Sequence, residues 1–170
     1  PRGFAARMPR RVFGLVLSAV QSEVFNRVVM ARLGSLDTLL PGDLAWKHDN
    51  GACFPVVDPA AEQARCASFA ISPSGPMPGP EMTQPTGEPA AIEAAALQAL
   101  ELRPEQFANL PFGLARGERR PLRVPVTDVA AQALEDWALR LSFTLPKGAC
   151  RTSVPGPLEY DGSRANQNAS

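Results

Sequence analysis

A long apolar segment near the beginning of the chain constrains the fold most. Between Val12 and Leu33, apolar residues recur at intervals of three and four, the spacing of one face of an α-helix. Gly34 follows as a residue that commonly ends a helix. Because apolar residues such as Leu15 and Val29 also occupy the other faces, we expect a central helix covered around most of its circumference.

A row of small polar residues interrupts this helix. Ser18, Ser22 and Asn26 are spaced one turn apart, with Gln21 beside them, so they form one stripe. Since buried polar groups need hydrogen-bond partners, we predict that the stripe is a buried seam docked against a neighbouring element. The same interruptions leave fewer than the roughly 20 continuous apolar residues of a membrane span, so no membrane-spanning segment is expected.

Turn and capping signals organise the part of the chain that follows. Asn50-Gly51 lies between two short β-prone runs, and this dipeptide strongly favours a β-hairpin. Asp58 followed by Pro59 has the pattern of a helix N-cap and first helical residue, so a short helix is predicted there. A strand over 69–72 is expected next, and the Pro- and Gly-rich residues 73–89 are predicted to form a loop.

The rest of the chain predicts further helices and then strands. Helices are expected over 89–102 and 104–109, each beginning with a proline. Residues 139–145 alternate apolar and polar side chains, which predicts a strand with one buried face. The pattern of 129–137 fits either helix or strand. This order of elements predicts an α+β fold.

Charge, cysteine content and motifs exclude several classes of protein. With 17 basic and 17 acidic residues, any nucleic-acid site must be a local patch. Three cysteines without a CxxC spacing argue against a disulfide framework or a zinc site and favour a reducing compartment. The single histidine, His48, lies in a predicted turn and is given no catalytic role. No P-loop, GxGxxG, HExxH or GxSxG motif is present.

Arginines cluster before the long helix and before the last strands. The two groups are Arg2, Arg7, Arg10, Arg11 and Arg116, Arg119, Arg120, Arg123. Each group is a candidate for binding phosphate. The alternative is that these side chains are solvated or paired with acids such as Glu105 and Glu118. Taken without a resemblance, the residues indicate only an α+β protein with two basic edges.

Five motifs in series resemble the TruD family of tRNA pseudouridine synthases. They are SxxQSxxFNxxxxxR from Ser18, Gly-Asp at 42–43, SGPMPG at 74–79, RRPLRV at 119–124 and FxLPxG from Phe143. Each motif alone is weak, but their order and spacing match from Arg10 to about Val154. The resemblance implies a cytoplasmic enzyme that isomerises a uridine in the D arm of tRNA to pseudouridine, with no cofactor and no metal.

The resemblance also implies how the chain is divided. Residues 1–117 correspond to most of an inserted α+β domain, and 118–155 to strands that return to complete the mixed sheet of the catalytic domain. Within the latter, 129–137 is expected to be strand. The polar stripe of the long helix is expected to lie where the inserted domain meets the catalytic domain. Residues 156–170 depart from the family pattern, and their polar, Pro-containing composition predicts a disordered tail.

Site residues follow from the same resemblance. The expected apolar wall for the uracil consists of Phe143, Leu145, Pro146 and Gly148, with plain strand packing as the alternative for Phe143 and Leu145. The candidates for contacts to tRNA phosphates are Arg10, Arg11, Arg119, Arg120 and Lys147.

No catalytic residue is assigned to this chain. The family's nucleophilic aspartate lies in a Lys-Asp motif upstream of the inserted domain, and this sequence contains no Lys-Asp dipeptide. We therefore predict a C-terminal part of a synthase that is inactive alone. The sequence does not fix the oligomeric state, for which a monomer is favoured. The alternatives are a non-catalytic RNA-binding or partner-binding module of the same descent, or a remnant that does not fold.

Overall fold

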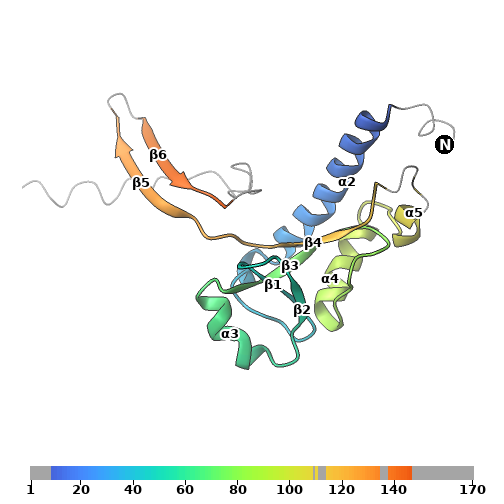
Figure 1. Ribbon diagram of the computed structural model, residues 1–170, viewed down its shortest axis with the longest axis horizontal. Helices are drawn as coiled ribbons and strands as arrows, with labels where there is room; N and C mark the ends of the chain where they lie inside the picture. The colour runs from blue at the N-terminus through green and yellow to red at the C-terminus, as the bar shows by residue number, and fades with distance from the viewer. Residues whose placement is uncertain (1–8, 109, 111–113, 135–137, 147–170) are drawn as a thin grey trace, which may run out of the picture. The chain divides into compact units, whose positions relative to one another are not determined.

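The computed structural model describes residues 9–108, 110, 114–134 and 138–146. The chain forms two compact units, Pro1–Val124 and Pro125–Ser170. The first unit contains an antiparallel four-stranded sheet with helices packed on it, and the second contains an antiparallel strand pair (Figure 1). The predicted α+β class is confirmed, and both sheets are antiparallel within the described residues.

The sheet of the first unit has the strand order β2-β1-β3-β4. Its strands are β1 (Leu44–Lys47), β2 (Cys53–Pro55), β3 (Ile71–Met77) and β4 (Glu118–Pro121). The hairpin predicted around Asn50-Gly51 is confirmed, since β1 and β2 pair with Trp46 opposite Cys53. Asn50 stabilises the turn by accepting the Ala52 N–H on its side-chain oxygen at 2.9 Å.

Strand β3 is longer than predicted and runs into the Pro-rich segment. Its prolines are tolerated because β3 changes partner along its length: Pro73 is the last residue paired with β1, and Pro76 pairs only with β4. The Pro73 carbonyl still accepts the Leu122 N–H at 2.8 Å. The prediction that a loop begins at Pro73 is therefore wrong, and the loop begins after Met77.

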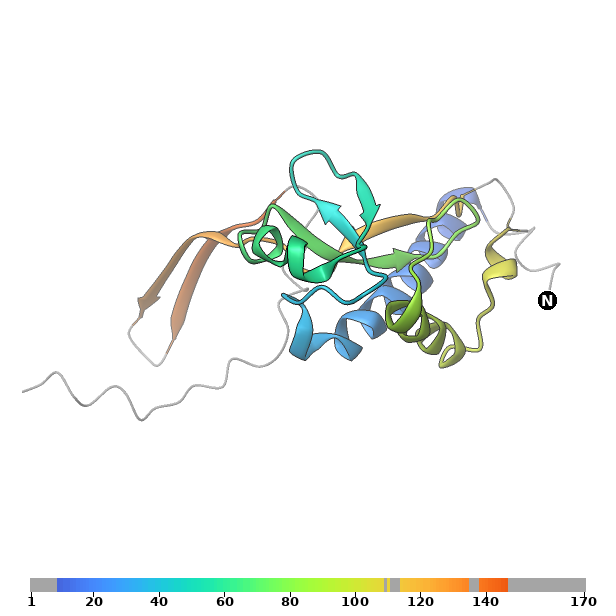
Figure 2. The same ribbon diagram turned by 90° about the horizontal axis from the view of Figure 1, so that it is seen from below.

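The predicted long helix is confirmed as α2 (Arg10–Ala31). It runs alongside β3 and α4 (Gly87–Gln98), as Figure 2 shows. One face is buried, and its residues are Phe13, Leu17, Gln21, Val24 and Val28. The expectation of cover around most of the circumference is wrong for the described structure, because Leu15 is 72% and Met30 63% exposed.

By length and composition alone, α2 is also apolar enough to cross a membrane. This result differs from the expectation, drawn from the polar residues that interrupt the helix, that the chain contains no membrane-spanning segment. In this unit, however, its buried face packs against β3 and α4, as in the core helix of a folded domain.

The shorter helices agree with the capping signals. Asp58 Oδ1 accepts the Ala60 and Ala61 N–H groups at 3.0 and 3.3 Å, so α3 (Pro59–Ala67) begins where predicted. A 3₁₀ turn, η1 (Leu33–Ser35), follows α2. Helix α5 (Pro104–Ala108) is confirmed, whereas α4 begins and ends earlier than predicted.

Three apolar clusters form the core of the first unit. The cluster between the sheet and α3 contains Leu39, Ala45, Val56, Cys66 and Ile71. The cluster between the first turns of α2 and α5 contains Phe13, Leu17, Phe107 and Ala115. The cluster between α2 and α4 contains Val24, Val28, Ala96 and Leu122. Helix α2 thus contributes to two of the three.

The second unit is described as β5 (Thr127–Ala133) paired with β6 (Leu139–Thr144). The strand expected within 129–137 is confirmed as far as Ala133, and residues 135–137 lie outside the described residues. The alternation of β6 predicts a buried face, but Leu139 is 55% and Leu141 41% exposed. The reason is that the described pair has no second layer to cover it. The tail 156–170 also lies outside the described residues.

Two glycines, Gly79 and Gly117, allow the main chain of the loop after β3 to contact the main chain just before β4. A β-carbon added at Gly79 would lie 2.2 Å from the Gly117 nitrogen, and Gly117 has a φ of +88°. Next to this contact, the Glu81 N–H donates to the Arg116 carbonyl at 2.8 Å. Any side chain at either glycine would separate the two segments.

We predict that Gly79→Ala lowers the free energy of unfolding by about 1–3 kcal/mol, because the methyl group would overlap fixed main-chain atoms. Gly14→Ala is the matched control, since a β-carbon there meets nothing within 4 Å and the position is inside α2. It should stabilise by roughly 0.5–1 kcal/mol. Denaturant unfolding measures both, and equal stabilities of Gly79→Ala and wild type would contradict the prediction.

Candidate nucleic-acid interface

Gln21 anchors the middle of α2 to the loop after β3. It is 8% exposed, and its side-chain amide donates to the Pro78 carbonyl at 2.8 Å. The predicted stripe is otherwise not buried: Ser18 and Asn26 are exposed and Ser22 is half-buried. Gln21 thus makes a hydrogen bond to a neighbouring element, as predicted for this helix, whereas within the first unit Ser18, Ser22 and Asn26 form no buried row. A docking seam between the inserted domain and the catalytic domain stays a prediction.

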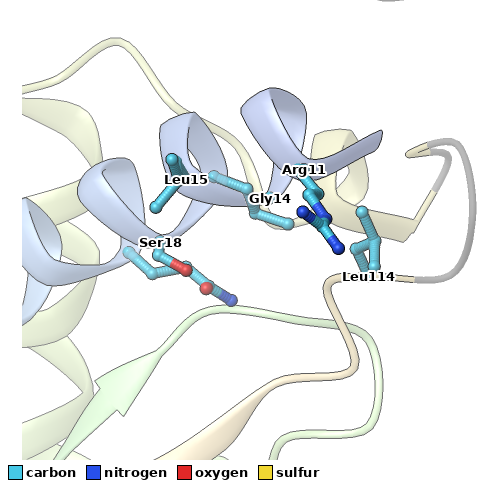
Figure 3. A pocket seen from close by; sticks show the side chains of 7 residues that line it. Arg11, Gly14, Leu15, Ser18 and Leu114 are labelled. Carbon is cyan, nitrogen blue, oxygen red and sulfur yellow. The ribbon is translucent and has the colours of Figure 1, made fainter. Parts of the chain in front are cut away.

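Two neighbouring hollows lie along this side of α2 and share Ser18, Gln21 and Leu114. The first, here called the apolar hollow, measures about 480 Å³ and is completed by Arg11, Gly14, Leu15 and Leu17. In Figure 3, Arg11 reaches from α2 toward Leu114 on the opposite side. The second, the arginine groove, measures about 520 Å³ and is completed by Arg10, Ser22, Met77, Arg116, Gly117, Glu118 and Arg120.

The structure brings together three of the predicted phosphate-binding residues on this surface. Arg10 and Arg120 line the arginine groove, and Arg11 lines the apolar hollow. Arg116 joins them. Arg120 is ion-paired with Glu118 at 2.9 Å, with both side chains more than half exposed, which is the acidic pairing considered as the alternative.

Arg119 lies inside the protein and not on this surface. Its guanidinium donates to the Ser74 hydroxyl at 3.0 Å, the Ser74 carbonyl at 2.8 Å and the Thr83 carbonyl at 3.2 Å. Two further bonds reach the Glu93 carboxylate at 2.5 and 3.2 Å. With all five N–H donors in use and a residue exposure of 6%, this environment argues against the predicted phosphate contact.

Glu93 is the buried acid that sequence reasoning missed. Burial raises the pKa of Glu93, and the Arg119 guanidinium opposes that rise. A signal exists in the sequence: Pro89, Glu93 and Ala96 are spaced to share one helix face, and they are the buried residues of α4. A charged residue on an apolar face indicates a buried partner.

A second buried ion pair was also missed. Arg32 donates to Asp43 at 2.8 Å, with side-chain exposures of 2% and 1%. The other Asp43 oxygen accepts the Leu40 N–H at 2.7 Å, and Arg32 also donates to the Thr38 carbonyl at 2.8 Å. Asp43 thus joins the end of α2 to the beginning of β1.

His48 lies at the opposite end of β1 from Asp43. Its Nε2 is 2.8 Å from the Ser72 hydroxyl, and its ring meets Phe69 edge-on. Arg123, a member of the second arginine group, stacks over Phe69 at 4.1 Å and does not line the arginine groove. Burial, and then the charge of Arg123, lower the pKa of His48.

The predicted uracil wall belongs to the second unit. Phe143 and Leu145 are half-buried and Pro146 is exposed. Gly148 and the phosphate candidate Lys147 lie outside the described residues. Among the residues that the structure describes, no group of three His, Cys, Asp or Glu side chains could hold a metal ion. The metal-free and cofactor-free reaction stays a prediction.

Comparisons with known proteins identify the family. The family model of tRNA pseudouridine synthase D (TruD) matches residues 3–155. This chain therefore belongs to the TruD family, whose members are isomerases that modify tRNA. A crystal structure assigned to tRNA pseudouridine synthase D from Methanosarcina mazei shares the fold, with a TM-score of 0.71 and 23% identity over 86% of this chain.

The relatives are considerably longer than this chain. It is 54% identical over 145 residues to the tRNA pseudouridine synthase D of Geobacter metallireducens, covering 85% of this chain and 35% of the relative. For the protein of the same name from Thermus thermophilus the identity is 38% over 141 residues, covering 82% and 38%. The chain therefore spans little more than a third of the length of these two relatives.

Arg119 and Arg120 are adjacent in the sequence, but one is buried and the other exposed, and replacing each in turn tests this difference. Arg119→Ala leaves the buried Glu93 carboxylate without its partner and should lower the free energy of unfolding by about 3–5 kcal/mol. Arg120→Ala removes an exposed pair and should cost about 0–1 kcal/mol. Thermal or denaturant unfolding compares them. Similar losses for both variants would show that the Arg119 network contributes little.

Proposed function

We propose that this chain is the C-terminal part of a tRNA pseudouridine synthase that isomerises a uridine in the D arm of tRNA, of the tRNA-Glu type, to pseudouridine. The observation that carries the proposal is the family match over residues 3–155. The arginine surface along α2 gives it a physical basis, because RNA affinity depends largely on contacts to phosphates. The proposed setting is a monomer in the cytoplasm.

The proposed reaction needs no cofactor. The glycosidic bond from the ribose to a ring nitrogen breaks, the base turns, and a carbon of the ring rejoins the ribose. The uridine must first leave its stack, at a cost of a few kcal/mol that contacts to the rest of the RNA offset. In this chain those contacts are proposed for Arg10, Arg11, Arg120 and Lys147, with Phe143, Leu145, Pro146 and Gly148 as the wall for the base. Arg119 is left out because its donors are used internally.

We further propose that the 170-residue chain alone does not catalyse the reaction, since it contains no Lys-Asp motif to supply the nucleophile. The second candidate function is a non-catalytic RNA-binding module. The arginine groove favours this second candidate, because all of its lining residues belong to the first unit. Both candidates bind RNA, and they differ in turnover.

If Arg120 contacts phosphate, Arg120→Ala should weaken tRNA binding and reduce the slope of log affinity against log salt by about one charge. Binding of unmodified tRNA to the chain, measured from low to moderate salt, provides the slope. Arg27→Ala is a suitable control, because Arg27 is an exposed, ion-paired arginine on α2 that lines neither hollow. An unchanged slope for Arg120→Ala would assign Arg120 to the solvated surface.

Incubation of the isolated chain with unmodified tRNA should yield no pseudouridine when the RNA is analysed by mass spectrometry of its nucleosides. A relative with the Lys-Asp motif, assayed on the same tRNA, is the positive control. Turnover by the isolated chain would reject the inactive-part proposal, and it would require a nucleophile within these 170 residues.

A further inference from the structure

We propose that the apolar hollow binds one unstacked base of an RNA loop, while the neighbouring arginine groove holds the phosphates beside that base. The inference rests on the proposed RNA-binding function and extends it, because it assigns a base-binding subsite to the face of α2 formed by Gly14, Leu15 and Ser18.

The lining of the apolar hollow suits the flat face of a base. Leu15, Leu17 and Leu114 supply apolar surface, and Gly14 leaves room where a side chain would stand. Leu15 is 72% exposed and belongs to none of the core clusters, so the first unit does not use it for its own packing. The volume of about 480 Å³ lies within the roughly 300–1,000 Å³ of small-molecule sites.

Charge selects RNA over an apolar peptide as the occupant. The two hollows together carry four arginines, Arg10, Arg11, Arg116 and Arg120, against one acid among their described lining residues, Glu118. That acid is already paired with Arg120. An RNA strand supplies a phosphate next to every base, so an apolar hollow opening into a cationic groove matches its repeating chemistry.

Polar groups at the boundary of the hollows can orient the base. Ser18 lines both, and its exposed hydroxyl can donate or accept. Arg11 reaches over the hollow toward Leu114, where its planar guanidinium can stack on a base (Figure 3). Gln21 holds the wall in place through its bond to Pro78.

Two labelled RNAs test the proposal with the full 170-residue chain. One is a hairpin with an unpaired, unmodified loop, and the other is a fully paired duplex of the same stem. Leu15→Ala should weaken binding of the hairpin about five- to tenfold, leave its salt slope unchanged and leave duplex binding unchanged. Met30→Ala is the control, because Met30 is 63% exposed on α2 and lines neither hollow. It should match wild type on both RNAs.

The outcomes separate the subsite from the proposed function. If wild type binds the hairpin with a steep salt slope but Leu15→Ala binds as Met30→Ala does, the subsite is rejected and the RNA-binding function stands. If Leu15→Ala weakens duplex and hairpin equally, the hollow does not recognise an unstacked base. If wild type binds neither RNA, the proposed function fails and the subsite fails with it. Thermal unfolding of both variants at the wild-type midpoint confirms that the substitutions act on binding.

Discussion

The rest of the first unit depends on the hydrogen bonds made by the buried guanidinium of Arg119. Through Ser74 it ties β4 to β3, through Glu93 it ties the sheet to α4, and through the Thr83 carbonyl it holds the segment between them. A charge removed from water is stable only when its partners are complete, and here each N–H has one. The position of β4, and with it one side of the arginine groove, follows from this arrangement.

The alternation of a strand divides two adjacent arginines between the inside and the outside. Successive side chains of β4 point to opposite faces, so the burial of Arg119 leaves Arg120 exposed beside Glu118. On α2, Gln21 is buried and bonded to Pro78, whereas Ser18 and Ser22 beside it are more exposed and line the arginine groove. The surface proposed for RNA is thus a by-product of how the core is closed.

Local signals in the sequence predicted the elements that depend on local physics. The Asn50-Gly51 turn, the Asp58 cap and the periodicity of α2 each need only neighbouring residues, and the structure confirms them. The length of β3 could not be predicted without knowing its partner strands, because its prolines are tolerated only where the pairing changes from β1 to β4. The length of a strand with two prolines cannot be read from propensity alone.

The candidate site was predicted less completely than the fold. Clustering of arginines located Arg10, Arg11 and Arg120, but clustering cannot tell which arginine meets a buried acid 26 positions away in the chain. Leu15 and Leu114 were missed because an apolar residue is expected to lie in the core unless its exposure is known. For the second unit, the alternation of β6 predicted the strand, and the described strand pair of that unit has no second layer of its own.

The crossing of Gly79 and Gly117 has a consequence for how such a surface can vary. Where these residues meet, the edge of the arginine groove is built from main chain, whose shape does not change with the identity of a side chain. The rest of the groove, on α2 and along β4, is built from side chains such as Arg10 and Arg120. The crossing is therefore a fixed point of the proposed RNA surface, and any variation of that surface falls to the side chains around it.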